Sequence, residues 1–92
     1  MWYVYILKCL DNSLYTGITD CIERRFKEHI SGKGGHYTNY NRPVEISYKE
    51  SFTNLFLAEK REQQIKRWSR AKKLALINGD KKLLRRLSQS RS

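Results

Sequence analysis

The sequence predicts a small α+β domain: a mainly antiparallel three-stranded sheet flanked by helices, in the order β-β-α-β-α-α. Its 92 residues are enough for one modest hydrophobic core and too few for two. Residues 2–9 are rich in aromatic and branched side chains, residues 14–18 follow a turn signal and residues 44–48 alternate apolar and polar side chains, as β-strands do; later segments repeat apolar residues at helical spacing. Aromatic residues make up 12% of the chain, which excludes the aromatic-poor composition of a disordered protein.

The first part of the chain is expected to form a β-hairpin. Residues 2–9 are rich in aromatic and branched side chains, which alternate between a face with Val4 and Ile6 and a face with Tyr3, Tyr5 and Leu7. The turn signal Asp11-Asn12-Ser13 follows, and residues 14–18 read as the second strand. Gly17 lies inside that strand, where a glycine is typical of a close approach by another group.

A helix is predicted to begin at Thr19-Asp20, with Asp20 as its N-cap and Glu23 completing a capping-box-like pair. A spacing of four residues predicts one buried stripe, formed by Ile22, Phe26 and Ile30. Arg25 and His29 share a neighbouring face that is expected to look toward the hairpin.

The rest of the chain is divided by glycines and caps. Residues 31–43 form a glycine-containing linker, and residues 44–48 alternate as a third strand. Thr53 or Asn54 is predicted to cap a helix that runs to about Trp68. A shorter helix is expected from Ser69 to Ile77, ended by Asn78-Gly79, and a last helix from Asp80, with buried Leu83, Leu84 and Leu87.

The positive charge is concentrated at the C-terminal end. The chain carries 19 lysines and arginines against 9 acidic residues, a net charge of +10. Residues 61–92 hold eleven basic and two acidic side chains, a net charge of +9, which leaves +1 for residues 1–60. Such an excess is typical of binding to a polyanion, most often nucleic acid. Ribosomal association, an anionic membrane surface and a solubilising tail are the alternatives. We divide the chain into a domain at 1–79 and a basic extension at 80–92.

Several classes of protein are excluded by composition. No stretch approaches the roughly 20 apolar residues of a membrane span, and the start lacks the pattern of a signal peptide. A cytoplasmic protein with reduced Cys9 and Cys21 is therefore expected. The histidine and cysteine spacings fit no zinc motif. Residues 31–35 lack the GK[ST] arrangement of a nucleotide-binding loop, so no nucleoside triphosphate site is predicted. We also expect no small-molecule cofactor.

Two short motifs lie on the predicted hairpin, Val4-Tyr5 in its first strand and Tyr15-Thr16-Gly17 in its second. With Arg25 and Glu62 on successive long helices, this ordered set resembles the GIY-YIG nuclease domain over roughly residues 2–77. It is most similar to small stand-alone members, which share the V-Y-I-L start, the E-R-R helix and the R-A-x-K-x-x-L-I ending. Two positions depart from the family pattern: Tyr3 replaces the glycine of the first motif, and Ile18 stands where some members carry a basic residue.

The resemblance implies hydrolysis of phosphodiester bonds in nucleic acid, DNA more than RNA, with one Mg²⁺ or Mn²⁺ ion. It gives Glu62 the role of metal ligand, because a carboxylate is a hard oxygen donor. Arg25 would hold the non-bridging phosphate oxygens with its planar fork of donors. Tyr5 and Tyr15 would bracket the attacking water, and one of them would take its proton. His29, whose ordinary pKa suits the role, is the competing base or proton relay. Gly17 would be structural at the site.

Each of these residues also has an ordinary structural interpretation. Tyr5 and Tyr15 are a pair of the kind that packs across a hairpin. Arg25 is a helix arginine of the kind that stays solvated. Glu62 stands four residues before Lys66, which suits an ion pair, although its register points it toward the predicted buried face.

Contact with nucleic acid is predicted for cations and an aromatic residue of the linker and of the segment after Glu62, namely Lys33, Tyr37, Lys66, Arg67, Arg70 and Lys73. The predicted function is a metal-dependent endonuclease. The alternatives are a nucleic-acid-binding module without catalysis and a ribosome- or RNA-associated protein.

Overall fold

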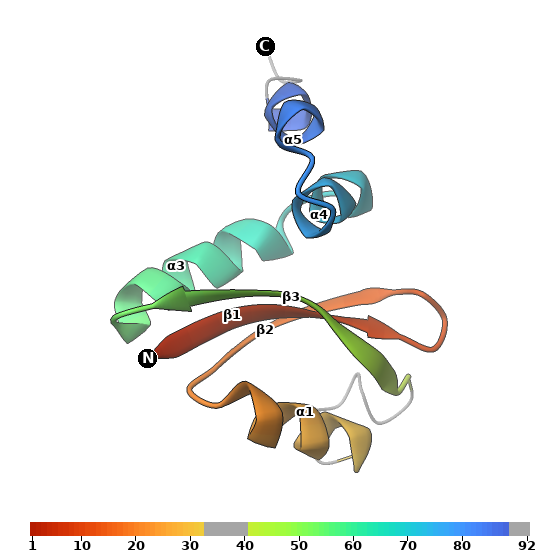
Figure 1. The fold of residues 1–92 in the computed structure, drawn as a ribbon, viewed down its shortest axis with the longest axis vertical. Helices are drawn as coiled ribbons and strands as arrows, with labels where there is room; N and C mark the ends of the chain where they lie inside the picture. The colour runs from red at the N-terminus through yellow and green to blue at the C-terminus, as the bar shows by residue number, and fades with distance from the viewer. Residues whose placement is uncertain (33–40, 89–92) are drawn as a thin grey trace.

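The three-stranded sheet runs across the middle of the molecule, with helices on both of its faces (Figure 1). The computed structural model describes residues 1–32 and 41–88. Along the chain the elements are β1 (Trp2–Cys9), β2 (Leu14–Thr19), α1 (Ile22–Ile30), β3 (Pro43–Phe52), α3 (Leu55–Lys66), α4 (Arg70–Ile77) and α5 (Lys81–Ser88). The predicted α+β class and order of elements are confirmed.

β1 is the central strand, in the order β2-β1-β3, and both neighbours are antiparallel to it. The hairpin turn forms as predicted: the Ser13 backbone N–H donates to Asp11 Oδ1 at 2.9 Å, and Asn12 adopts a positive φ of 69°. β3 is longer than the predicted residues 44–48. It pairs with β1 from Trp2↔Phe52 to Cys9↔Pro43, and these backbone bonds keep its polar end in strand conformation.

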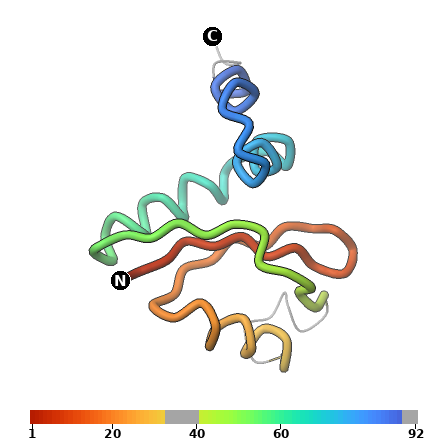
Figure 2. The backbone as a smooth tube through the Cα atoms, viewed as in Figure 1, coloured from red at the N-terminus to blue at the C-terminus, as the bar shows by residue number. Residues whose placement is uncertain are grey.

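The two faces of β1 serve two separate cores. Val4 and Ile6 pack with Ala58 and Ile65 under α3, and the opposite face contributes Tyr5 and Leu7 to a second cluster with Ile22 of α1. Figure 2 shows α1 on one side of the sheet and α3 on the other. The predicted alternation along residues 2–9 is therefore confirmed, and it puts the tyrosines on the α1 side.

α1 differs from its prediction at both ends. Its N-cap is Cys21 rather than Asp20, and no side chain caps it. The Asp20 carboxylate is instead held by Arg24 Nη2 at 2.6 Å, and Thr19 Oγ1 accepts from the Cys21 N–H at 3.2 Å. Ile30 is 42% exposed although it was predicted to be buried, because the face of α1 that packs on the sheet runs through Ile22, Phe26 and His29 instead.

The other helix ends follow the sequence closely. Asn54 Oδ1 accepts from the Leu57 N–H, Ser69 Oγ from the Lys72 N–H and Asp80 Oδ1 from the Leu83 N–H, at 2.9, 3.2 and 3.1 Å. Gly79 has a φ of +68° just after α4.

α5 projects away from the sheet (Figure 1). It has no buried residue, so the prediction that Leu83, Leu84 and Leu87 are buried is wrong, and all three are half-buried. The physical reason is that α5 packs mainly on α4 and lies beyond the reach of the sheet. No helix within residues 1–32 and 41–88 is long and apolar enough to cross a membrane.

Candidate active site

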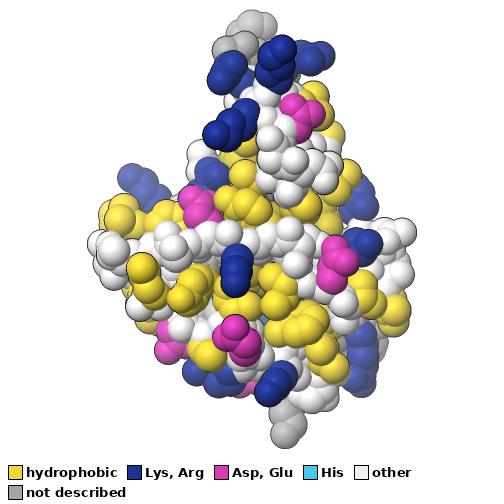
Figure 3. Space-filling model, in the orientation of Figure 1, with side chains coloured by type: hydrophobic (Ala, Val, Ile, Leu, Met, Phe, Trp, Pro, Cys, Tyr) yellow, Lys and Arg dark blue, Asp and Glu magenta, His cyan; other side chains and the backbone are white. Residues whose placement is uncertain are grey.

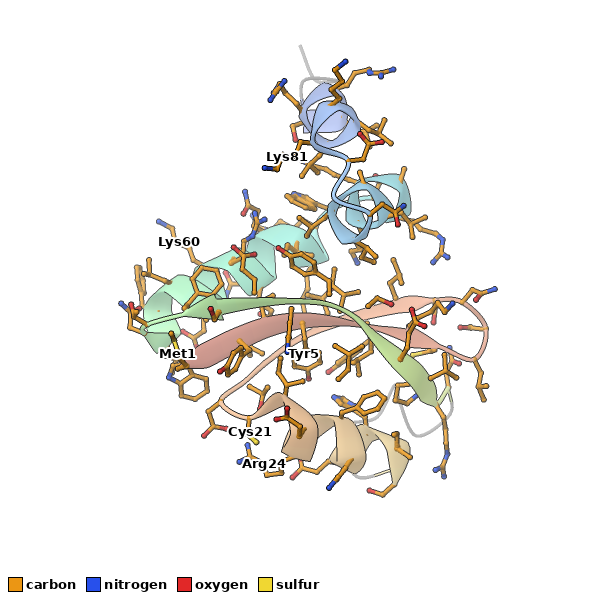
Figure 4. All side chains as sticks on the ribbon, in the orientation of Figure 1. Met1, Tyr5, Cys21, Arg24, Lys60 and Lys81 are labelled. Carbon is orange, nitrogen blue, oxygen red and sulfur yellow. The ribbon has the colours of Figure 1, made fainter. Side chains whose placement is uncertain are left out.

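Tyr5 stands at the centre of a polar cluster between the sheet and α1. Its side chain is directed from β1 toward α1 (Figure 4), and the residue is only 2% exposed. The Tyr5 hydroxyl lies 3.0 Å from His29 Nε2 and is also hydrogen-bonded to the Arg25 side chain. Because a guanidinium can only donate, Tyr5 accepts from Arg25 and has its own proton to offer to His29. The expectation that Arg25 and His29 look toward the hairpin is confirmed.

Gly17 makes room for the Tyr5 ring. The two residues are direct partners in the β1–β2 register, and a Cβ built on Gly17 would overlap the Tyr5 phenol. Any side chain at this position would therefore push the ring aside. The close approach predicted from the sequence is confirmed, and the group that approaches is the phenol of Tyr5.

Tyr15 completes a cluster of three rings. Its ring centroid lies 6.5 Å from that of Tyr5 and 5.1 Å from that of His29, and the latter pair meets edge to face. Such contacts are favourable packing in themselves. The two tyrosines therefore do pack against each other across the hairpin, as their ordinary structural interpretation predicts. The same ring contacts keep the Tyr5 hydroxyl next to His29.

Burial sets the protonation of this cluster. Burial raises the pKa of Tyr5 to about 12, with smaller contributions from Tyr15 and Glu62, although the Arg25 guanidinium opposes them. Burial and the charge of Arg25 lower the pKa of His29 to about 4. The ordinary histidine pKa assumed from the sequence is thus wrong for this site, because the ring is fully buried beside a cation. At pH 7 both Tyr5 and His29 are neutral.

The adjacent residues Arg24 and Arg25 have different environments, and the sequence alone does not show which of them lies at the site. Arg24 is exposed and turned to Asp20 at the start of α1. Arg25 is about one-third exposed and reaches the Tyr5 hydroxyl, and its Nη1 is also held by Glu28 Oε1 at 3.0 Å. The arginine that adjoins the tyrosines is therefore the one that the family resemblance selects.

Glu62 joins the cluster from the opposite layer. It lies on α3, its side chain is only 14% exposed, and its charge is near enough to raise the pKa of Tyr5. The carboxylate pairs with Lys66 Nζ at 3.1 Å, so the ion pair considered from the sequence is present. Side chains of β1, β2 and α1 thus contact one another, and Glu62 of α3 interacts electrostatically with Tyr5; the contacting residues are Tyr5, Tyr15, Arg25 and His29.

The cluster offers a hard divalent cation one protein ligand, the Glu62 carboxylate. Glu62 offers one partly buried carboxylate, and within the described ranges 1–32 and 41–88 no three acidic, histidine or cysteine side chains gather as a metal cage. An ion bound here would complete its coordination with water and substrate oxygens, as Mg²⁺ commonly does.

The predicted nucleic-acid contacts fall in three places. Lys33 and Tyr37 lie outside the described residues. Arg67 and Arg70 are exposed, at the end of α3 and the start of α4. Lys66 and Lys73 line a pocket of about 310 Å³ together with three residues of β2, namely Leu14, Tyr15 and Thr16.

Sequence reasoning did not single out Thr16 as a site residue. It is 4% exposed, and its hydroxyl has no hydrogen-bond partner among the described residues. A threonine in a strand is ordinary in sequence. The one available signal is its place between Tyr15 and Gly17, which puts its side chain on the face opposite to that of Tyr15.

Comparison with known proteins gives one consistent result. The family model described as the GIY-YIG catalytic domain matches residues 1–75. A UPF0213 protein of Staphylococcus haemolyticus is 51% identical over 75 residues, which cover 82% of this chain and 92% of that protein. A UPF0213 protein of Syntrophus aciditrophicus is 54% identical over 76 residues, covering 82% and 87%. The solution NMR structure of a UPF0213 protein from Bacillus halodurans is 42% identical, covers 85% of this chain and 84% of its own, and superposes with a TM-score of 0.55.

Proposed function

Because the chain belongs to the GIY-YIG family, we propose that it is a metal-dependent endonuclease. It would hydrolyse phosphodiester bonds in nucleic acid, with DNA favoured over RNA. The observation that carries the proposal is the Tyr5 hydroxyl, held between Arg25 and His29 within the electrostatic reach of Glu62. Hydrolysis of a phosphodiester needs a positioned water, a route for its proton and positive charge on the phosphoryl oxygens, and these residues can supply all three.

Arg25 would hold the scissile phosphate. Its guanidinium has five donors in a planar fork, which suits two non-bridging oxygens at once. The hydrogen bonds to Tyr5 and Glu28 fix the orientation of the group before substrate arrives, so little reorganisation accompanies binding.

Tyr5 would pass the proton of the attacking water to His29. A phenol with a pKa of about 12 is a poor base at pH 7, but it can accept a proton at oxygen while its own proton moves to a hydrogen-bonded acceptor. Neutral His29 is such an acceptor, 3.0 Å away. A phosphodiester bound on Arg25 would offset the positive charge that lowers the pKa of His29, which makes that nitrogen a better base in the complex. Tyr15 would bracket the water from the second strand.

Glu62 would bind the Mg²⁺ or Mn²⁺ ion in place of its ion pair with Lys66. When bound, such an ion stabilises the charge that develops on the phosphoryl oxygens.

The direct test is cleavage of plasmid and branched DNA with Mg²⁺ or Mn²⁺, by the wild type and by Glu62→Gln. We expect the variant to lose roughly a hundredfold or more in rate while its DNA affinity stays within about threefold. Glu59→Gln is the matched control, because Glu59 is an exposed carboxylate on the same helix. Binding without cleavage across these substrates and metals would reject the nuclease and leave the non-catalytic binding module, in which Glu62 and Lys66 form only an ion pair.

A further inference from the structure

We propose that Thr16, Lys66 and Lys73 form a subsite for a second, non-scissile phosphate of the nucleic-acid strand, next to Tyr15. The ligand class rests on the proposed function, but the subsite is defined by residues that lie outside the five-residue cluster. It would fix how the strand enters the candidate active site.

The subsite is a pocket at the edge of the sheet. β2 is an edge strand, and the pocket of about 310 Å³ is bounded by its residues Leu14, Tyr15 and Thr16 and by one lysine each from α3 and α4. Tyr15 is one of the residues that line this pocket, and its ring contacts the His29 ring on the α1 side of the sheet. A nucleic-acid strand whose scissile phosphate rests on Arg25 would therefore cross the sheet edge at Tyr15 to reach this pocket on the α3 side.

The Thr16 hydroxyl is the most specific feature of the pocket. The residue is 4% exposed and pairs with Ile6 in the register, yet its Oγ1 has no hydrogen-bond partner among the described residues. Buried hydroxyls nearly always have a partner, because an unpaired one lowers stability. A hydroxyl can donate to a phosphate oxygen, so a phosphate in the pocket would supply the missing partner once the Thr16 side chain turns its buried Oγ1 toward the pocket.

The two lysines supply the charge. Lys66 is 53% exposed and lies against Glu62, whereas Lys73 is half-buried. Burial lowers the pKa of Lys73, and the nearby positive charge of Lys66 lowers it further. Two like charges held near each other are unfavourable until an anion comes between them. Glu62 already pairs with Lys66, and a metal ion on Glu62 would free that ammonium for the phosphate.

The first test measures binding without cleavage. A fluorescein-labelled oligonucleotide is titrated in EDTA and followed by anisotropy at several salt concentrations. We expect about tenfold weaker binding for Lys73→Gln and about threefold for Thr16→Val, and a salt slope for Lys73→Gln that is smaller by roughly 0.7 to 0.9. Lys60→Gln is the matched control: Lys60 is exposed on α3 and is not among the residues that line the pocket, so we expect less than a twofold change.

Thr16→Val separates binding from folding. Valine has the shape of threonine and lacks the unpaired hydroxyl, so the thermal midpoint should stay the same or rise while binding weakens. Weaker binding together with a lower midpoint would mean that Thr16 supports the fold and would overturn its part in the subsite. So would equal losses in Lys60→Gln and Lys73→Gln, because they would reduce the effect to general charge.

The second test locates the phosphate. In a set of oligonucleotides, one neutral methylphosphonate linkage is placed at a different position in each. At one position the neutral linkage should weaken binding to the wild type about tenfold, and at that position it should not weaken binding to Lys73→Gln. If inorganic phosphate shifts the amide NMR signals of Thr16 and Lys73 but no linkage matters, the pocket takes a free anion and the proposal fails. Linkage-specific binding without any cleavage would keep the subsite and reject the nuclease.

Discussion

At the scale of single residues, two neighbours determine the position and the hydrogen bonding of the Tyr5 side chain: a glycine lies beside its ring and a buried histidine lies at its hydroxyl. Gly17 determines where the ring can lie, and His29 determines where the hydroxyl proton can go. Each of the two can be changed by itself, and each change has a distinct signature.

Gly17→Ala should displace the Tyr5 ring. The added methyl group would overlap the phenol, so the variant is expected to lose about 1–3 kcal/mol of stability, as overpacked sites do, and to lose nearly all cleavage activity. Urea unfolding and the cleavage assay measure the two effects. Gly79→Ala is the control: its φ of +68° makes alanine unfavourable by about 1 kcal/mol, but an added Cβ touches nothing within 4 Å. Cleavage that survives Gly17→Ala would contradict the role given to the ring position.

His29 should make folding sensitive to acid. Its pKa is about 4 when folded and about 6.5 when unfolded, so below pH 6.5 the unfolded chain binds more protons. The stabilisation is complete above pH 6.5 and is lost as the pH falls toward 4, by at most about 3 kcal/mol. The measurement is urea unfolding at successive pH values, compared with His29→Gln, which does not titrate. Parallel pH profiles for the two proteins would show that His29 is not the sensitive group.

At the scale of elements, the helix starts depend on side-chain caps that are readable in the sequence. Asn54, Ser69 and Asp80 each accept a backbone N–H in the first turn of the helix that follows. α1 lacks such a cap, and its position comes from its contacts with the sheet.

Asn54→Ala should therefore destabilise the protein by about 1 kcal/mol, because the Leu57 N–H loses its acceptor at the start of α3. Asn54→Asp retains an acceptor oxygen and should cost little. Both are measured by urea unfolding with unchanged m-values. An equal loss in the two variants would mean that the cap oxygen is not what matters at this position.

The same elements show why sequence reasoning succeeded in some places and failed in others. The alternation of residues 2–9 predicted both faces of β1 correctly, since each face is buried under a different helix. The Asp20 cap was wrong because Arg24, one turn away, competes for the same carboxylate. The predicted burial of the three α5 leucines was wrong because helical periodicity shows which face is apolar but not whether anything covers it.

At the scale of the whole molecule, the candidate site draws on four elements, and that limits what a sequence can predict of it. The resemblance selected Arg25 over Arg24, and the structure brings that arginine to Tyr5; Glu62, whose register points it inward, lies near enough to raise the pKa of Tyr5. Two properties depend on the three-dimensional surroundings: the pKa of His29, lowered by burial and by Arg25, and the Thr16 hydroxyl, which has no hydrogen-bond partner within residues 1–32 and 41–88. No pattern of residue types carries either of them.

The charge of the molecule is as unevenly placed in space as it is in sequence. Several lysine and arginine side chains lie on the visible face of the projecting end formed by α5 (Figure 3). Residues 80–92 contribute five basic residues and one acidic residue, a net charge of +4. This arrangement suits a basic arm that raises affinity for a polyanion while the sheet and its two helix layers hold the site.

A chain that ends at Gly79 tests this division. Because α5 has no buried residue, the truncated chain should unfold within about 1 kcal/mol of the full chain. Its DNA affinity at 0.1 M salt should fall by about tenfold or more, with a smaller salt slope, while cleavage at saturating DNA stays the same. A full-length control with glutamine at the four basic residues of α5 keeps the helix and removes its charge: Lys81, Lys82, Arg85 and Arg86. If the truncated chain binds weakly and the glutamine variant binds normally, contacts of the helix rather than its charge hold the nucleic acid. If the truncated chain does not fold, the domain does not end at residue 79.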